Sequence, residues 1–287
     1  MKISTEIHSA SVLVGEEKAV ELIAKAGFDY YDLSMFRMCH YDWANRRLME
    51  NDHPYAGNDY LKFVKSIKKI AADNGITCNQ AHAPFPTCCK EIRDFYDRAL
   101  ECAAEAGAKC CVVHPDNVLP PEQNAEMYFE LLPKAKAYGV KIATENMWGW
   151  DSEKQRAAFA ACSTPQSMLD HLKAVDDPDF VVCLDIGHAE MMEETSAVEM
   201  IRAIGGKHLQ ALHIHDNDKI HDNHKLPLTM SIDYPPIIKA LKEIGYTGDF
   251  TLEADQCLKD YGKDRIEEGL AQMAKTARAL ADEFERA

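Results

Sequence analysis

Residues 181–188 of this 287-residue chain read VVCLDIGH, a run of four apolar residues closed by Asp185 and followed by His188. A short apolar run of this kind is typical of a strand buried on both faces, as in a parallel sheet covered by helices. The same form recurs at residues 140–146 (VKIATEN), 209–218 (LQALHIHDND) and 249–255 (DFTLEAD). The repetition indicates successive parallel strands whose carboxyl ends carry acids and histidines.

Strand-like segments alternate with helix-like segments along the whole chain. We expect strands at residues 2–7, 28–33, 76–82, 109–114, 140–145, 180–185, 209–215 and 249–253. Amphipathic patterns predict helices at residues 16–26, 58–74, 90–106, 122–138, 164–175, 196–204, 233–244 and 264–286. Eight strands with eight helices predict an α/β fold, the (β/α)8 TIM barrel. A doubly wound sheet usually has fewer strands and often a glycine-rich phosphate loop, which this sequence lacks.

The composition agrees with one large globular unit. A chain of 287 residues with 46% hydrophobic content can bury a large core, and no Pro/Gly/Ser-rich linker divides it, so we expect a single domain over residues 1–287. The formal net charge of −15 repels a long polyanion, which disfavours nucleic acid as a partner and favours a small molecule. The outer helices of such a barrel also offer surfaces for a homo-oligomer.

The polar N-terminal segment and the ten cysteines bear on the compartment. Residues 1–15 are too polar for a secretory signal, and no stretch approaches the roughly 18 apolar residues of a membrane span, so we expect a cytoplasmic protein without a membrane partner. Several cysteines, such as Cys110, Cys111 and Cys183, fall in predicted strands. We interpret them as reduced thiols of the core.

Potential metal ligands close the predicted strands or follow them directly. Because a barrel of parallel strands brings their carboxyl ends to one face, these residues are expected to surround one or more divalent ions. Four of them lie on the last four strands and form an oxygen-rich set suited to manganese, magnesium, cobalt or zinc. These four are Glu145, Asp185, His215 and Glu253, and the further candidates are His82, His114, His188, His213, Asp222 and His224.

The pattern leaves some alternatives open. His213 and His215 have strand spacing, so both side chains point to the same face and alternation does not decide which binds metal. Any one of the candidates alone could be a helix cap, a capped core histidine or a solvated turn residue. Several clustered carboxylates without a cation would repel one another, however, which favours the metal site for the set as a whole.

Long loops after three of the strands are expected to form the walls of the site. Residues 147–150 read MWGW, and Trp148 is a candidate for an apolar wall, although an aromatic residue there could also pack over the barrel. Arg37, Arg46 and Arg47 on an earlier loop could grip a phosphate, but exposed loop arginines are usually solvated.

The order of the motifs TEN, LDIGH, HIHDND and LEAD resembles the xylose isomerase-like barrel superfamily, which includes sugar-phosphate isomerases and epimerases, ketose 3-epimerases and endonuclease IV. Resemblance to the ketose epimerases implies that Glu145, Asp185, His215 and Glu253 hold the metal, because the family ligand is the second histidine of the HxH pattern. It also implies that His188 contacts the substrate. The epimerases have an arginine soon after the strand-seven ligand, and residues 217–225 contain none.

Endonuclease IV provides a rival comparison within the same superfamily. Its three-zinc site resembles a set of nine residues in this chain, namely His82, His114, Glu145, Asp185, His188, His215, Asp222, His224 and Glu253. The acidity of the chain and the MWGW segment favour a sugar substrate instead.

From these features we predict a metal-dependent sugar or sugar-phosphate isomerase or epimerase. Glu145 and Glu253 would be its acid/base pair, one removing and the other returning a proton through an enediolate. A multi-zinc phosphodiesterase and a catalytically silent sugar-binding barrel are the alternatives.

Overall fold

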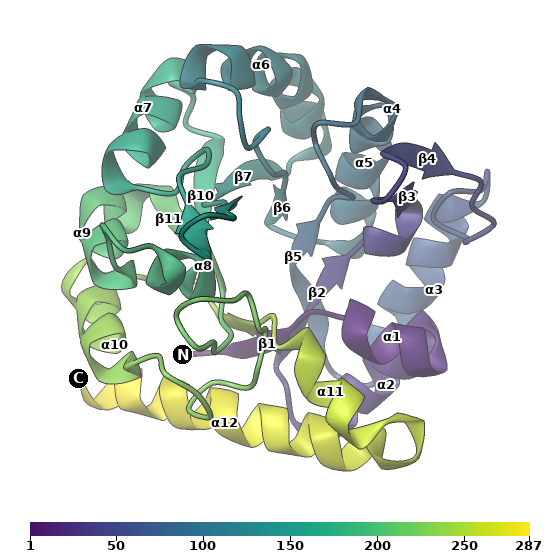
Figure 1. The fold of residues 1–287 in the computed structure, drawn as a ribbon. Helices are drawn as coiled ribbons and strands as arrows, with labels where there is room; N and C mark the ends of the chain where they lie inside the picture. The colour runs from purple at the N-terminus through teal and green to yellow at the C-terminus, as the bar shows by residue number, and fades with distance from the viewer.

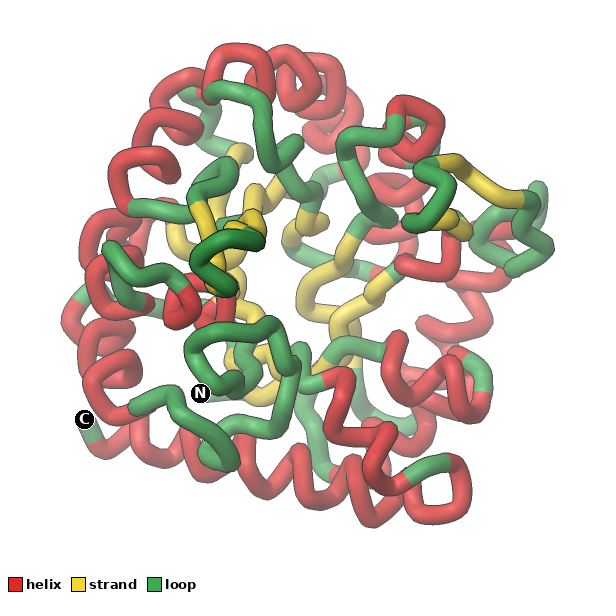
Figure 2. The backbone as a smooth tube through the Cα atoms, in the orientation of Figure 1, coloured by secondary structure: helices red, strands yellow, loops and turns green.

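A computed structural model describes all residues 1–287 as a (β/α)8 barrel, with the strands in an inner ring and the helices outside (Figure 1, Figure 2). All eight predicted strands are present, most of them shorter than expected at one or both ends. They are β1 (Ile3–Thr5), β2 (Tyr30–Ser34), β5 (Thr77–His82), β6 (Cys110–Val112), β7 (Lys141–Glu145), β10 (Phe180–Asp185), β11 (Leu209–His213) and β12 (Phe250–Leu252).

Parallel pairing runs around the whole ring. Six strands form a sheet in the order β11-β10-β7-β6-β5-β2, and β1 pairs with β12. Two further parallel bridges, Glu6 with Asp32 and Ile214 with Leu252, join these two sheets. The barrel is therefore closed, and all eight strands end at the same face.

The outer layer consists of the predicted helices together with several short ones. The long helices are α2 (Glu16–Ala26), α3 (Tyr60–Asp73), α5 (Tyr96–Ala106), α6 (Pro121–Tyr138), α7 (Pro165–Val175), α9 (Ala197–His208), α10 (Tyr234–Glu243) and α12 (Ile266–Arg286). Two of them, α2 and α5, end at Gly27 (φ 97°) and Gly107 (φ 92°), which have the left-handed backbone expected of helix-terminal glycine.

Four short helices depart from the prediction. They are α1 (His8–Val14), α4 (Lys90–Arg93), α8 (Ile186–Met191) and α11 (Asp255–Tyr261). Residues 90–106 were expected as one helix, but the structure has two, α4 and α5, separated by Asp94 and Phe95. At this point the Phe95 N–H donates to Ile92 O (3.0 Å), three residues back, in place of the four-residue spacing of an α-helix. The other three extend over only six or seven residues, too few for a periodic apolar pattern to stand out.

Two of the long loops fold into antiparallel hairpins. Residues 35–57 contain a 3₁₀ turn (Phe36–Met38) and the hairpin β3 (His40–Asp42) with β4 (Arg47–Met49). Residues 147–163 contain the hairpin β8 (Gly149–Asp151) with β9 (Arg156–Ala158). The third, residues 216–232, stays irregular and is held by an antiparallel bridge between Asp216 and Lys225.

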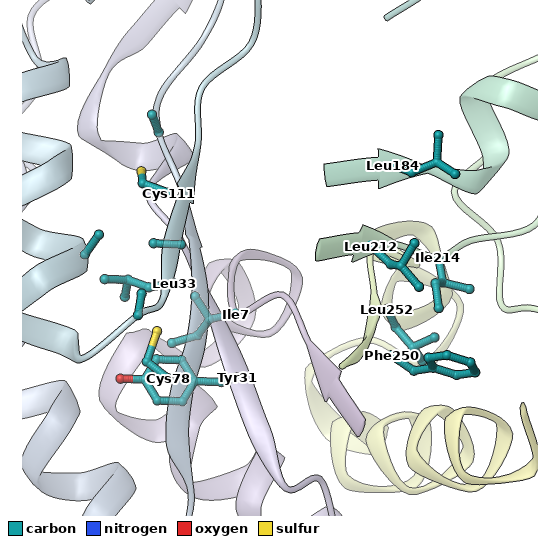
Figure 3. Close-up of a cluster of buried hydrophobic side chains, with 14 of the residues drawn as sticks. Ile7, Tyr31, Leu33, Cys78, Cys111, Leu184, Leu212, Ile214, Phe250 and Leu252 are labelled. Atoms are coloured by element: carbon teal, nitrogen blue, oxygen red, sulfur yellow. The ribbon is translucent and has the colours of Figure 1, made fainter. Parts of the chain in front are cut away.

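The apolar core lies mainly between the strands and the helices. Labelled side chains from both sides of the barrel, such as Leu33, Cys111, Leu184 and Leu212, extend from their strands toward the surrounding helices (Figure 3). A smaller cluster includes Cys110, Val112, Ala143, Val181, Cys183 and Ala211, which alternate with these residues and face the barrel interior. All ten cysteines are free, and nine of them are buried.

The other half of the barrel interior is polar. Ser4 Oγ donates to Asn79 Oδ1 (2.8 Å), and Asn79 Nδ2 donates to Thr251 Oγ1 (3.0 Å). Thr251 Oγ1 donates to Gln80 Oε1 (3.2 Å), and Gln80 Nε2 donates to Asp32 Oδ2 (3.0 Å). This buried chain of hydrogen bonds therefore reaches Asp32, a carboxylate in the middle of β2.

No helix in the structure combines the length and the apolar character needed to cross a membrane.

Candidate metal centre

The carboxyl ends of the last four strands bring four potential ligands together. One oxygen or nitrogen atom from each of Glu145, Asp185, His213 and Glu253 lies within 4.8 Å of the others. His213 Nδ1 is 3.2 Å from Glu145 Oε2 and 3.3 Å from Glu253 Oε2. Strand pairing fixes this arrangement, because Cys183 is in register with Glu145 and Asp185 with His213.

The histidine in this four-residue group is His213, whereas the resemblance implied His215. His213 is the last residue of β11 and points into the barrel directly beside Glu145 and Glu253. His215 lies two residues beyond the strand and leans toward α8, where a Cβ at Gly187 would overlap its imidazole. The glycine of DIGH thus makes room for His215, and the two histidines of the HxH pattern belong to different parts of the site.

A second group forms around Asp222 on the loop after β11. His188, His215, Asp222 and His224 each offer an atom within 4.8 Å of the others. His224 Nε2 and His188 Nε2 lie 3.0 Å and 3.4 Å from Asp222 Oδ2, and His215 Nε2 lies 3.5 Å from Asp222 Oδ1. His215 Nε2 is also 3.1 Å from Asp185 Oδ1, so Asp185 connects this group to the first.

The early histidines complete a third group with Glu145. His82 Nε2 and His114 Nε2 lie 3.5 Å and 3.3 Å from Glu145 Oε2. Glu145 therefore belongs to two groups, and the structure brings all ten sequence-predicted ligand candidates to one face of the barrel.

The hydrogen bonds of the histidines fix which ring nitrogen faces the acids. The Nδ1–H groups of His82, His188 and His224 donate to the carbonyl oxygens of Ala83 (2.8 Å), Asn146 (2.9 Å) and Glu253 (2.7 Å). When these rings are neutral, their Nε2 lone pairs therefore face carboxylate oxygens, and two acceptors are brought together. Only a proton or a cation between them relieves that arrangement.

His213 has the same arrangement in mirror form, because its Nε2–H donates to Asp32 Oδ2 (3.4 Å) and its Nδ1 faces the two glutamates. Buried atoms in all three groups have no hydrogen-bond partner: His114 Nε2, Glu145 Oε2, Asp185 Oδ2, His213 Nδ1, His215 Nδ1 and Asp222 Oδ1. Bare nitrogen and oxygen atoms converging on shared points fit divalent cations, and the mixed N/O donor set suits zinc, cobalt or manganese.

The pKa values of these side chains follow from their burial and from close opposite charges. Burial opposes a charge on His188, but Asp185 and Asp222 outweigh it and raise the pKa of His188 to about 10. Burial lowers the pKa of His114 to about 4. Burial and the charge of Glu145 raise the pKa of Glu253, whereas His213 and His114 overcome burial and hold the pKa of Glu145 well below its usual value.

Two residues without a place in the predicted site position its ligands. Asn146, the residue after Glu145 in TEN, accepts from the Asp185 N–H (2.8 Å) and donates to Asp185 O (2.9 Å), which clamps β7 to β10. Asp32 is completely buried and holds His213 through the hydrogen bond to Nε2. The sequence signal for Asp32 is an acid within the otherwise strand-like run YYDLS at residues 30–34.

A cavity of about 630 Å³ opens over the three groups. Phe36, Phe85, Met147 and Trp148 form apolar parts of its wall, and the indole N–H of Trp148 donates to Asp222 Oδ2 (3.3 Å). No lysine or arginine lines this cavity. It therefore offers a phosphate group no lysine or arginine, and its size falls in the range of about 300–1,000 Å³ that is common for small-molecule sites.

The arginines considered for a phosphate lie elsewhere. Arg37 lies 3.3 Å from Glu16 Oε1, and Arg47 lies 3.9 Å from Asp42 Oδ2. Arg46 is exposed, and none of the three lines the cavity with the ligand groups.

Comparison with known proteins places the chain in a family. The model of the family described as xylose isomerase-like TIM barrel matches residues 20–280. Among curated proteins, the uncharacterized protein MJ1311 of Methanocaldococcus jannaschii is 31% identical over an alignment of 174 residues that covers 56% of this chain and 55% of that protein. The chain thus matches little more than half the length of MJ1311. The uncharacterized protein y4fM of Sinorhizobium fredii is 24% identical over 282 residues, covering 83% of this chain and 81% of that protein.

Solved structures show the same fold at low identity. A D-tagatose 3-epimerase-like protein superposes with a TM-score of 0.71 at 22% identity, over 100% of this chain and 97% of the other. The IOLI protein with a bound zinc atom gives 0.71 at 18%, over 100% and 99% of the two chains. A D-psicose 3-epimerase gives 0.68 at 17%, over 98% and 99%. The fold and the family match agree, and the chain belongs to the xylose isomerase-like TIM barrel family.

Proposed function

We propose that the protein is a metal-dependent isomerase or epimerase of a neutral sugar. The observation that carries this proposal is the convergence of Glu145 and Glu253 on His213 Nδ1, at the floor of a cavity that no lysine or arginine lines. A neutral polyhydroxylated molecule fits that cavity better than a phosphorylated one. The epimerases among the structural neighbours agree with this class of substrate.

The residues that would hold a divalent cation for this reaction are Glu145, Asp185, His213 and Glu253. We choose His213 because its bare nitrogen faces both glutamates. His215, the histidine of the sequence prediction, stays a candidate through its Nε2, which lies 3.1 Å from Asp185 Oδ1. Such a cation supplies Lewis acidity, which lowers the cost of forming an enediolate from an α-hydroxy carbonyl. The other two groups could hold further ions.

The protein itself would supply the proton transfers and the binding surface. Glu145 and Glu253 both line the cavity, and one would remove the proton beside the carbonyl while the other returns one. Return to the opposite face of the same carbon gives epimerisation, and return to the neighbouring carbon gives isomerisation. His188 would contact substrate hydroxyls, and Trp148 would shield one face of the sugar from water.

A test of the proposal starts from protein stripped by a chelator and reloaded separately with manganese, cobalt, zinc or magnesium. Incubation with a panel of ketoses and aldoses in D₂O is expected to place deuterium on the carbon beside the carbonyl, which proton NMR detects directly. The stripped protein without added metal is the control. Absence of deuterium incorporation across the panel with every metal would reject the proposed function.

Asp32 offers a further test through metal affinity. Asp32→Asn is expected to weaken binding of the reloaded metal about 10- to 100-fold, because the variant loses the carboxylate that orients His213. Calorimetric titration of the stripped protein with Zn²⁺ measures this without any turnover. Asp73→Asn, an exposed acid on α3, serves as the control and should bind as the original protein does. Equal Zn²⁺ affinity in both variants would show that Asp32 has no role in positioning.

The grouping of ligands also supports a second candidate, a multi-zinc phosphodiesterase resembling endonuclease IV. The overlapping groups, linked through Glu145 and Asp185, contain all nine residues that the resemblance to a three-zinc site implies. The net charge of −15 and the lack of lysine and arginine in the cavity weigh against it. Cleavage of a duplex with one abasic site by zinc-loaded protein would favour this candidate, and uncut duplex would leave the sugar reaction as the function to pursue.

A further inference from the structure

A second hollow continues the cavity that holds the ligand groups. It measures about 430 Å³ and lies between the start of α1 and the β3–β4 hairpin. Four residues, His8, Phe36, Trp43 and Phe85, line both hollows. One groove therefore leads from the metal ligands, past Phe36, to the hairpin seen beside α3 and α5 in Figure 1.

Aromatic rings form the passage between the two hollows. Phe36 packs edge-on against His82 (4.8 Å between ring centres) and Phe85 (5.0 Å), so it is fixed to the wall of the ligand groups. Trp43 lines both hollows as well, and its ring packs against Tyr41 (5.0 Å) but stays 63% exposed. A large exposed aromatic ring on the rim of a cavity offers a flat apolar face on which a sugar ring can stack.

The polar side of the second hollow carries balanced charge. Arg37 is 3.3 Å from Glu16 Oε1, and His53 Nε2 is 2.9 Å from the same oxygen. The guanidinium is therefore already neutralised, which does not suit capture of a phosphate. Asn51, Asp52 and His40 add donors and acceptors to the same wall. Aromatic surface together with such polar groups fits a neutral ring with several hydroxyl groups.

We propose that the second hollow is a subsite for the second ring of a disaccharide or glycoside. The sugar unit that reacts would lie over the ligand groups, and the attached ring would cross Phe36 and stack on Trp43. This inference rests on the proposed function, because it takes the first hollow to be the place where a sugar reacts. It narrows the substrate class from single sugars to sugars that carry a glycosidic substituent.

Binding can be tested apart from turnover. Calorimetric titrations of the protein with cellobiose, maltose and lactulose are compared with titrations with glucose and fructose. At least one two-ring sugar is expected to bind about tenfold more tightly than the single sugars, and Trp43→Ala is expected to remove that advantage. Trp43 is exposed, so its replacement should leave the circular dichroism spectrum and the melting temperature unchanged.

Trp150→Ala provides the matched control. Trp150 is 41% exposed on the β8–β9 hairpin and lines neither hollow, so its loss should change two-ring binding less than twofold. Equal affinity for one-ring and two-ring sugars, or an unchanged preference in Trp43→Ala, would overturn the subsite. Tight two-ring binding that depends on Trp43, without turnover of any sugar, would support the subsite and reject the proposed isomerase reaction.

Discussion

Glu253→Gln is expected to lower sugar turnover by about 10²–10⁴-fold, the range that general acid/base catalysis contributes. The amide keeps the size of the side chain and an oxygen near His213 Nδ1, but it cannot carry the proton between substrate carbons. Glu145→Gln should be at least as damaging, because this residue belongs to two ligand groups. Steady-state kinetics on whichever sugar the panel identifies measures both effects.

Loss of folding must be separated from loss of chemistry in these variants. Glu126→Gln, on the outer helix α6 and exposed, is the matched control and should retain full turnover. The circular dichroism spectra of all three variants should match that of the original protein. Turnover within tenfold of the original in either Glu145→Gln or Glu253→Gln would refute the assignment of that residue to acid/base chemistry.

Removal of metal is expected to destabilise the whole barrel. Buried acids and bare histidine nitrogens converge in the site, so we expect ions to bind the folded chain and not the unfolded one. An ion present at about a thousand times its dissociation constant then adds about 4 kcal/mol to the free energy of unfolding. For a chain of this size that free energy corresponds to a fall in melting temperature of about 10 °C on chelation. Differential scanning calorimetry before chelation, after it and after reloading with Zn²⁺ measures the change.

A variant without the central ligand gives the comparison for this effect. His213→Gln lacks the nitrogen that faces both glutamates, and its melting temperature should respond much less to the chelator. If the original protein melts at the same temperature with and without chelator, metal bound to these side chains does not contribute to the stability of the fold.

The barrel was predictable because each of its strands corresponds to a recognisable apolar run in the sequence. Apolar runs such as VVCL at residues 181–184 recur with the spacing of βα units, and every predicted strand is present. The hairpins β3–β4 and β8–β9 were not predicted, because their strands have three residues each and lie on loops whose packing depends on the finished barrel. Helices as short as α8 likewise depend on a local cap, the Asp185 side chain that accepts from the His188 N–H (2.6 Å).

The residues of the site were predictable as a set, but their division into groups was not. Side-chain alternation predicts that His213 and His215 point to the same face. It does not predict how far along the barrel axis each lies, and therefore which group each joins. Depth is decided by where β11 ends and by the space that Gly187 leaves for His215, both of which are tertiary features. Asp32 lies far from the motifs in sequence and reaches His213 only because the barrel closes.

The hydrogen-bonded chain from Ser4 through Thr251 to Asp32 has a consequence for attempts to engineer this protein. Through Asp32 it links the amino-terminal end of the barrel interior to His213. Substitutions at Asn79 or Gln80 can therefore change the position of Asp32 and His213, and with it the preference for one ion over another. A mutant library confined to the substrate-facing walls would omit these positions. Selection for a new metal or a new sugar should therefore randomise these interior positions together with the residues that line the cavity.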